Sequence, residues 1–199
     1  MAKLASVPPN PKLRPHTGRR RNDAARQAIL TATTDLLARR GTTVTIGDIT
    51  AAAGVSRHTI YRWWPSRGML LLEAMAEWAR EGAPAPDTGT LAEDLKIFLT
   101  ATFAAAAAPP AATLLRAVLA EAQSDSATAE LLAAFARDRR GVLHRILERA
   151  QARGELAADT DRELVIDQVY GVLWYRLTVA RTPLDAETAE RLAGSLLKQ

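Results

Sequence analysis

Residues 54–67 read GVSRHTIYRWWPSR, in which a glycine turn precedes a cationic and aromatic segment that ends at a proline. Gly54 favours the left-handed backbone conformation that ends a helix, and Ser56 is a good N-cap for a helix that follows. The Pro-Ser pair after the second tryptophan ends that helix and can begin another. The stretch therefore predicts a short helix over residues 57–64, set between two turns.

The segment before this stretch predicts a partner for the short helix. Thr45-Ile-Gly-Asp48 has the form of a capping box, with Asp in the place of the usual Glu, and it opens a helix with apolar residues on one side. Two short helices joined by a glycine turn form a helix-turn-helix unit. A longer helix is expected upstream, over residues 23–40, where apolar residues recur at helical spacing.

The helix over residues 57–64 has three distinct sides. At about 100° per residue, Ile60 and Trp64 fall on nearly the same side, which must pack on the preceding helices. Tyr61 and Trp63 lie on the two flanks. The outward side is polar and cationic, and it consists of Arg57, His58, Thr59 and Arg62.

This distribution suits a helix laid in the major groove of DNA, where outward side chains reach base edges and the flanks meet phosphate. Arg57 and Arg62 can donate to guanine, and Thr59 can pack on a thymine methyl group. Free backbone N–H groups at the start of a helix can donate to a phosphate oxygen. Candidate phosphate contacts on these grounds are Thr45, Ser56 and Arg67.

Residues 49–74, ITAAAGVSRHTIYRWWPSRGMLLLEA, resemble the DNA-binding signature of the tetracycline-repressor-like (TetR/AcrR) transcriptional regulators. The resemblance is strong over residues 22–82 and extends to the C-terminus by helix order alone. It implies an all-α, dimeric protein of about nine helices that binds a palindromic operator and is released by a small ligand. Repression is the expected sign of regulation, with activation as the alternative.

The resemblance also implies roles for single residues. Positions matching Thr45, Ser56, Tyr61 and Trp63 touch phosphate in the family, and those matching Arg57, His58 and Thr59 contact bases. Two residues depart from the family pattern. Trp63 stands where the family often has His, and Thr50 replaces a usual alanine. Thr50 is small enough for the two helices to cross, and the indole N–H of Trp63 can still donate to phosphate.

Charge is divided unevenly along the chain. Residues 1–68 hold twelve Lys or Arg against three Asp, a net charge of +9, whereas the remaining 131 residues carry −5. A basic first third suggests a polyanion-binding module beside a body with another task. The alternative is that arginine is simply abundant throughout the chain.

Other function classes find little support. The chain has no cysteine, and His16 and His144 are isolated, so neither a disulfide framework nor a metal site is expected. No nucleophile–base pair indicates an enzyme, and no cofactor motif is present. No apolar run reaches the roughly 18 residues of a membrane span, and the start lacks the apolar core of a signal peptide. A cytoplasmic protein without membrane partners is expected.

Three segments follow from these patterns. Residues 1–21 combine four prolines with six positive charges and predict a disordered basic arm. Insertion of the arm into a minor groove, through Arg19 to Arg21, is the alternative to a flexible tail. Residues 22–82 form the expected helix-turn-helix domain, with its motif at 45–64. Residues 83–199 follow a Pro/Gly-rich break and form an all-helical domain for effector binding and dimerisation.

The two last helices are the expected dimer interface. The helix at about 161–180 is apolar around most of its circumference, so it must be buried on more than one side. The helix at about 186–198 has one clean apolar face. Together they predict a four-helix bundle across a two-fold axis, and the family resemblance implies the same pairing. The alternative is that the first of them is a central helix of a monomer.

An effector cavity is expected among the middle helices. Its apolar and aromatic walls predict a hydrophobic or aromatic effector. Candidate lining residues are Trp78, Phe98, Phe103, Leu115, Leu119, Phe135, Tyr170 and Trp174. The alternative function is a helical protein that binds or sequesters small molecules and associates with nucleic acid without sequence preference.

Overall fold

The structure of the chain is a computed structural model that describes residues 17–79 and 85–198, except for the side chains of 17–21 and Trp78. Within these residues, all regular secondary structure is helical. The N-terminal elements are α1 (Thr17–Arg40), the 3-10 turn η1 (Gly41–Thr43), α2 (Ile46–Ala53), α3 (Arg57–Trp63) and α4 (Arg67–Ala79). The later elements are α5 (Leu91–Ala107), α6 (Pro109–Ala122), α7 (Ser126–Ala152), α8 (Arg162–Trp174), the π-helical η2 (Tyr175–Ala180) and α9 (Ala186–Leu196). The predicted all-α fold of about nine helices is confirmed for these residues.

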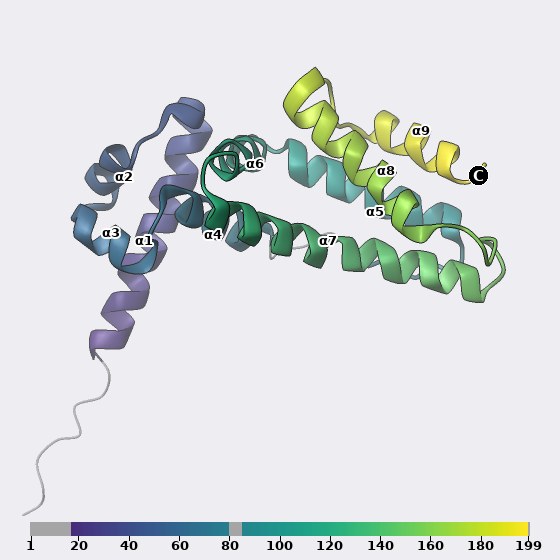
Figure 1. The fold of residues 1–199 in the computed structure, drawn as a ribbon, viewed down its shortest axis with the longest axis horizontal. Helices are drawn as coiled ribbons and strands as arrows, with labels where there is room; N and C mark the ends of the chain where they lie inside the picture. The colour runs from purple at the N-terminus through teal and green to yellow at the C-terminus, as the bar shows by residue number, and fades with distance from the viewer. Residues whose placement is uncertain (1–16, 80–84, 199) are drawn as a thin grey trace, which may run out of the picture.

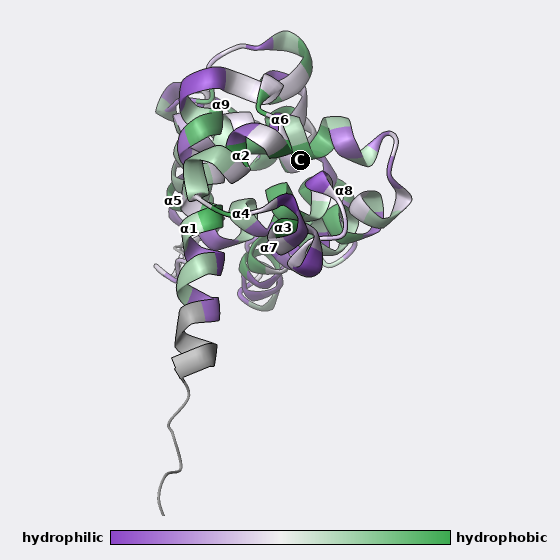
Figure 2. Ribbon diagram, turned by 90° about the vertical axis from the view of Figure 1, so that its left-hand side faces the viewer, coloured by the Kyte–Doolittle hydropathy of each residue, from purple (hydrophilic) through white to green (hydrophobic). Residues whose placement is uncertain are grey.

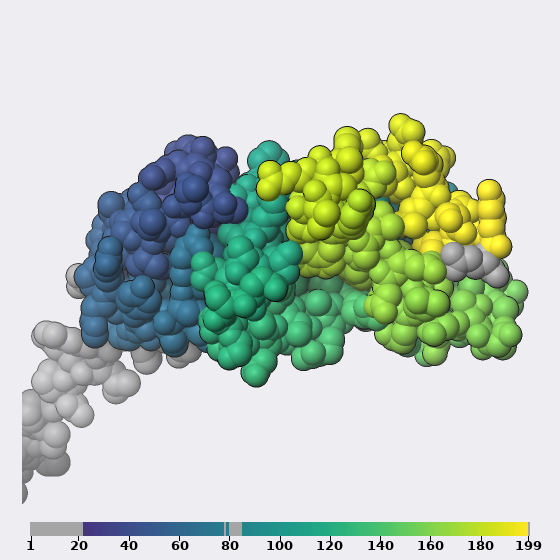
Figure 3. Space-filling view, turned by 45° about the horizontal axis from the view of Figure 1, so that its top comes forward, coloured from purple at the N-terminus to yellow at the C-terminus, as the bar shows by residue number. Residues whose placement is uncertain are grey.

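The helices form two groups that meet along one side. Helices α1, α2 and α3 gather at one end of the molecule, and α7 runs from there along the length of the other group (Figure 1). The space-filling view shows the purple and blue N-terminal group in direct contact with the teal and green segments of the second group (Figure 3). Helix α4 packs on α6 and α7, and α1 also packs on α6. Helix α6 is therefore the common support of both groups.

One continuous apolar core holds the two groups together. It extends from Ile29 and Leu37 in α1 to Leu196 in α9, and includes Phe98 and Phe103 at its centre. Hydrophobic and hydrophilic residues alternate along the same helical ribbons (Figure 2), as amphipathic helices around a shared core require.

Two helix starts differ from the sequence prediction. Helix α1 begins at Thr17, so residues 17–21, expected in the disordered arm, are helical. Arginine is a good helix former, and the run of three arginines extends the helix upstream of Asn22. The rest of the expected arm, residues 1–16, lies outside the described residues. The spacing of Thr160 and Glu163 predicts a capping box for α8, but the structure has Asp161 as the cap, which accepts from the Leu164 N–H. Aspartate is a stronger N-cap than threonine.

A small polar cluster joins α4 to the start of α7. Ser66 Oγ donates to Asp125 Oδ2 at 3.0 Å and accepts from the Met69 N–H at 3.2 Å, which confirms Ser66 as a cap of α4. Hydrogen bonds from Thr128 and then Ser66 hold the pKa of Asp125 below its usual value. The backbone of Gly68 lies against the fully buried side chain of Thr128. The two helices therefore meet at a site with no room for a further carbon atom.

Replacement of Gly68 by alanine tests this close approach. A Cβ at this position would lie 2.1 Å from Thr128 Oγ1 and 2.9 Å from Thr128 Cβ. We expect Gly68→Ala to lower the free energy of unfolding by about 1–3 kcal/mol, as overpacking does in cores, measured by urea denaturation. Gly141→Ala, within α7, is the matched control, because its Cβ would meet only Arg145 Nη1 at 3.8 Å. It should stabilise by about 0.5–1 kcal/mol through helix propensity. Equal effects of the two variants would contradict the close approach.

Candidate nucleic-acid interface and ligand cavity

Three capping interactions fix the helix-turn-helix geometry, and each was predicted. Thr45 Oγ1 accepts from the Asp48 N–H while Asp48 Oδ2 accepts from the Thr45 N–H, which completes the capping box of α2. Hydrogen bonds from Thr45, and then from Arg40, hold the pKa of Asp48 well below its usual value. Gly54 ends α2 in the left-handed region, at φ 65°. Ser56 Oγ accepts from the Thr59 N–H and begins α3.

Helix α3 has the inward and outward sides that the sequence predicts. Ile60 and Trp64 are buried, at 0% and 2% exposure. Thr59 and Trp63 are half-buried. The exposed side chains of this segment are Arg57, His58, Tyr61 and Arg62. Thr45 and Ser56 are exposed as well. We call these two cap residues, together with Arg57, His58, Thr59, Tyr61, Arg62 and Trp63, the α3 face.

The adjacent tryptophans have different partners. Trp64 Nε1 donates to Glu73 Oε2 of α4 at 2.6 Å, and Glu73 is also paired with Arg26 of α1. Trp63 packs edge-on against Trp64, with ring centroids 5.5 Å apart, and the Arg62 guanidinium lies 5.4 Å from the Trp63 ring centroid. Trp64 thus anchors α3 to its scaffold, whereas Trp63 supports an arginine of the α3 face.

Arg67 is placed differently from the phosphate contact expected of it. Its guanidinium donates to the backbone oxygens of Thr42 and Val44 and pairs with Glu121 of α6. A guanidinium has five N–H donors, and these internal acceptors occupy its nitrogens in a half-buried position. Arg67 therefore joins the helix-turn-helix unit to α6. Its pairing with Glu121 was not predicted.

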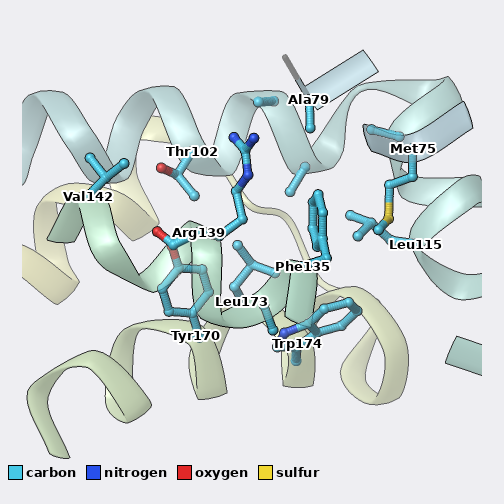
Figure 4. A pocket seen from close by; sticks show the side chains of 14 residues that line it. Met75, Ala79, Thr102, Leu115, Phe135, Arg139, Val142, Tyr170, Leu173 and Trp174 are labelled. Atoms are coloured by element: carbon cyan, nitrogen blue, oxygen red, sulfur yellow. The ribbon is translucent and has the colours of Figure 1, made fainter. Parts of the chain in front are cut away.

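A cavity of about 280 Å³ lies between α4, α5, α6, α7 and α8 (Figure 4). Of the expected lining residues, Leu115, Phe135, Tyr170 and Trp174 lie on it. Phe98 and Phe103 do not line it; they are 1% and 0% exposed and belong to the apolar core. Leu119 is also absent from the lining, and the side chain of Trp78 lies outside the described residues. The lining residues that were not predicted are Met75, Ala79, Thr102, Ala105, Ala106, Ala111, Ala136, Arg139, Val142 and Leu173.

Among these residues, Arg139 is the one that the sequence pattern could have indicated as a lining residue. Phe135, Arg139 and Val142 recur at positions i, i+4 and i+7 of α7, so they share one face of the helix. An arginine inside an otherwise apolar stripe is the signal that could have found it. The small lining residues carry no comparable signal, because alanine is common on every face of these helices.

The outer face of α8 and η2 carries exposed apolar side chains. Leu164, Tyr175 and Val179 are 54%, 59% and 70% exposed. Gly171 lies between them, and a Cβ built there would meet nothing within 4 Å. This α8 face, formed by Leu164, Gly171, Tyr175 and Val179, lies in a region where the sequence predicts a dimer interface.

No group of three His, Asp or Glu side chains that could hold a metal ion occurs within residues 17–79 and 85–198. No single helix in these ranges is long and apolar enough to cross a membrane; α5 and α6 reach that length and apolarity only as a pair, which is bent by 77° at its junction.

Comparisons with known proteins match both groups of helices. Residues 29–74 match the family model for bacterial regulatory proteins of the tetR family, and residues 85–196 match the tetracyclin repressor-like C-terminal domain. The HTH-type transcriptional regulator YdeS of Bacillus subtilis is 32% identical over 164 residues, which cover 81% of this chain and 82% of YdeS. AqdR of Rhodococcus erythropolis, also an HTH-type transcriptional regulator, is 28% identical and covers 92% of this chain and 89% of its own.

Solved structures agree with these matches. The TetR family transcription regulator SCO0332 superposes with a TM-score of 0.70 at 29% identity, covering 87% of this chain and 97% of its own. FadR of Bacillus subtilis, solved in complex with stearoyl-CoA, has the same TM-score at 18% identity, covering 86% and 97%, which shows a shared fold. The C-terminal family model alone matches more than half of the chain, and the N-terminal model matches the segment that contains the helix-turn-helix unit. The chain therefore belongs to the tetR family of bacterial transcriptional regulators.

Proposed function

We propose that this regulator is a ligand-responsive, one-component repressor that binds a palindromic operator as a homodimer and is released by a small apolar effector. The observation that carries the proposal is the α3 face, where Arg57, His58, Tyr61 and Arg62 are exposed on a helix held from behind by Ile60 and Trp64. A helix of this kind can enter a major groove while its scaffold stays on the DNA backbone.

Each residue of the α3 face has a proposed role in DNA binding. Arg57, His58 and Thr59 contact base edges, and Arg62 reaches either a base or the backbone. Tyr61 and Trp63 contact phosphate from the flanks. Thr45 and Ser56 bring the N-termini of α2 and α3 to phosphate, where backbone N–H groups can donate. Arg67 supports this surface from within, because its guanidinium binds the backbone just before Thr45.

The proposed dimer forms through the α8 face together with α9. Exposed side chains as apolar as Tyr175 and Val179 are costly in water when they form one continuous surface, and a second copy covers them symmetrically. Pairing at this end places two α3 helices on the same assembly. A two-fold axis then requires two half-sites in opposite orientation, which is a palindromic operator.

The position of the cavity supports the proposed release by an effector. Its walls include Met75 of α4 and Leu115 of α6, and these are the helices that meet at Arg67 and Glu121. A ligand that favours one arrangement of α4 and α6 over another shifts the population of spacings between the two α3 helices. Spacings that do not match successive major grooves bind the operator weakly.

DNA selection tests the α3 face. Duplexes selected from a random library should contain a palindrome, protected as a discrete footprint, with affinity that falls steeply as salt rises. Arg57→Ala should lower affinity for the selected site by about 1–3 kcal/mol and relax the base preference at one position in each half-site. Tyr61→Ala should weaken binding to all sequences alike.

Arg145→Ala is the matched control, because it removes the same charge from an exposed position of α7. It should bind the selected duplex like the parent protein. Parental affinity and preference in Arg57→Ala and Tyr61→Ala would contradict the assignment of α3. Diffuse protection without a palindrome would favour the alternative of a small-molecule-binding protein with nonspecific nucleic-acid association.

The oligomeric state tests the α8 face. We expect the parent chain to sediment as a dimer and Val179→Glu to sediment as a monomer, because two carboxylates would be buried close to each other across the axis. Leu131→Glu, at a 39% exposed apolar position of α7, is the control and should remain dimeric. A dimer that persists in Val179→Glu, or a monomeric parent, would place the interface elsewhere or remove it.

A further inference from the structure

Besides the hydroxyl of Tyr170 and the indole N–H of Trp174, the side chains of the cavity wall are apolar except for two groups that the core of a protein normally leaves outside. One is the guanidinium of Arg139 on α7, and the other is the hydroxyl of Thr102 on α5. Both side chains extend into the space between their helices (Figure 4). The remaining lining residues offer alkyl, thioether and aromatic surface. The chemistry of a ligand for this cavity is therefore decided by these two groups.

Arg139 has no carboxylate partner among the described residues. Its side chain lies against the Phe135 ring, whose centroid is 5.3 Å from the Arg139 Cζ. The next residue, Arg140, is paired with both Asp167 and Glu163. A guanidinium beside an apolar cavity that contacts an aromatic ring, and no anion within residues 17–79 and 85–198, has its charge open to a ligand.

Thr102 supplies an unsatisfied hydroxyl. Its Oγ1 is buried and has no hydrogen-bond partner among the described atoms. Other helical threonines of this chain avoid that state: Thr33 donates to the Ile29 carbonyl at 2.8 Å, and Thr178 donates to the Trp174 carbonyl at 2.6 Å. Because a buried hydroxyl without a partner costs free energy, an acceptor placed in the cavity would be stabilised by Thr102.

Tyr170 does not compete for this role. Its hydroxyl donates to the backbone oxygen of Arg139 at 2.8 Å, so its hydrogen atom is already engaged. Burial raises the pKa of Tyr170 to about 12, which keeps the phenol neutral at physiological pH. The cavity wall therefore carries the positive charge of Arg139 and no negative charge among its described lining residues.

The size of the cavity limits the ligand. Its volume of about 280 Å³ is at the lower end of small-molecule pockets, which measure about 300–1,000 Å³. A small ligand, on the order of ten non-hydrogen atoms, suits such a space. Most of those atoms must be carbon, because the walls around Met75, Leu115 and Leu173 offer no hydrogen bonds to a polar ligand.

We propose that the cavity binds the ionised form of a small monocarboxylic acid with an apolar or aromatic body of about ten non-hydrogen atoms. The carboxylate accepts from the Arg139 guanidinium and the Thr102 hydroxyl, and the body packs against Phe135, Trp174 and the aliphatic walls. This assignment rests on the proposed function in taking the cavity as the effector site, and it replaces a general hydrophobic effector with an amphipathic, anionic one.

Paired ligands test the charge requirement. Octanoate and 3-phenylpropanoate are compared with octanamide and 3-phenylpropanamide, which have the same shape and no charge, by titration calorimetry on the full-length protein. We expect each carboxylate to bind at least tenfold more tightly than its amide. Arg139→Gln should remove this difference, and Thr102→Val should weaken the carboxylates about fivefold, as expected for loss of one hydrogen bond.

Arg137→Gln is the matched control, because it removes the same charge from an exposed position two residues away on α7. It should bind both carboxylates like the parent. Thermal unfolding of each variant without ligand checks that the fold is retained, and Arg139→Lys, which keeps the charge, should retain a preference for the carboxylates. Equal affinity for carboxylate and amide, binding of neither, or an unchanged preference in Arg139→Gln would overturn the proposal.

Release from the selected DNA duplex separates this proposal from the proposed function. If the amides displace the protein from DNA as well as the carboxylates do, the chain is ligand-responsive and the anionic assignment is wrong. If the carboxylates bind through Arg139 and leave DNA affinity unchanged, the site assignment is right and the ligand-responsive role of the cavity is wrong.

Discussion

The arrangement of the two helix groups depends on the contacts that the Arg67 guanidinium makes. It binds the backbone oxygens of Thr42 and Val44, which lie between α1 and α2, and it pairs with Glu121 at the end of α6. Three segments far apart in the sequence thus share one side chain. A lysine could not replace it, because a single ammonium group cannot span acceptors that diverge in this way.

The polar cluster around Ser66 acts beside Arg67. Asp125 and Thr128 fix the start of α7 against the start of α4, and Gly68 lets the two backbones approach. Polar contacts of this kind are specific in geometry and modest in net free energy. The neighbouring apolar core supplies most of the stability, while these contacts define how the DNA-binding unit is set against the body.

Local sequence signals predicted the N-terminal unit well. The capping box at Thr45, the left-handed Gly54 and the cap at Ser56 act between residues at most a few positions apart, so the sequence contains both partners of each interaction. The inward position of Trp64 followed from helical periodicity. The internal contacts of Arg67 were not predicted, because its partner Glu121 is 54 residues away and no local pattern shows which of its possible acceptors it will meet.

The cavity was harder to predict for a related reason. An aromatic residue on a buried helix face can fill the core or line a space, and the choice depends on how several helices pack. Phe98 and Phe103 fill the core, whereas Phe135 and Trp174 line the cavity. Small side chains, such as those of Ala106 and Ala111, leave the space that forms the cavity. The sequence gives no direct indication of which small residues will face each other.

The bond from Trp64 to Glu73 has a consequence for how far a signal must travel. Glu73 holds α3 from α4, and Met75, two residues further along α4, lies on the cavity wall. At 1.5 Å of rise per residue, about 3 Å of helix axis separates the two positions. Arg26 of α1 pairs with the same glutamate, so one carboxylate joins three helices beside the cavity. Under the proposed ligand response, a tilt of α4 at the cavity would therefore reach α3 through a single hydrogen bond, without a long chain of intermediate contacts.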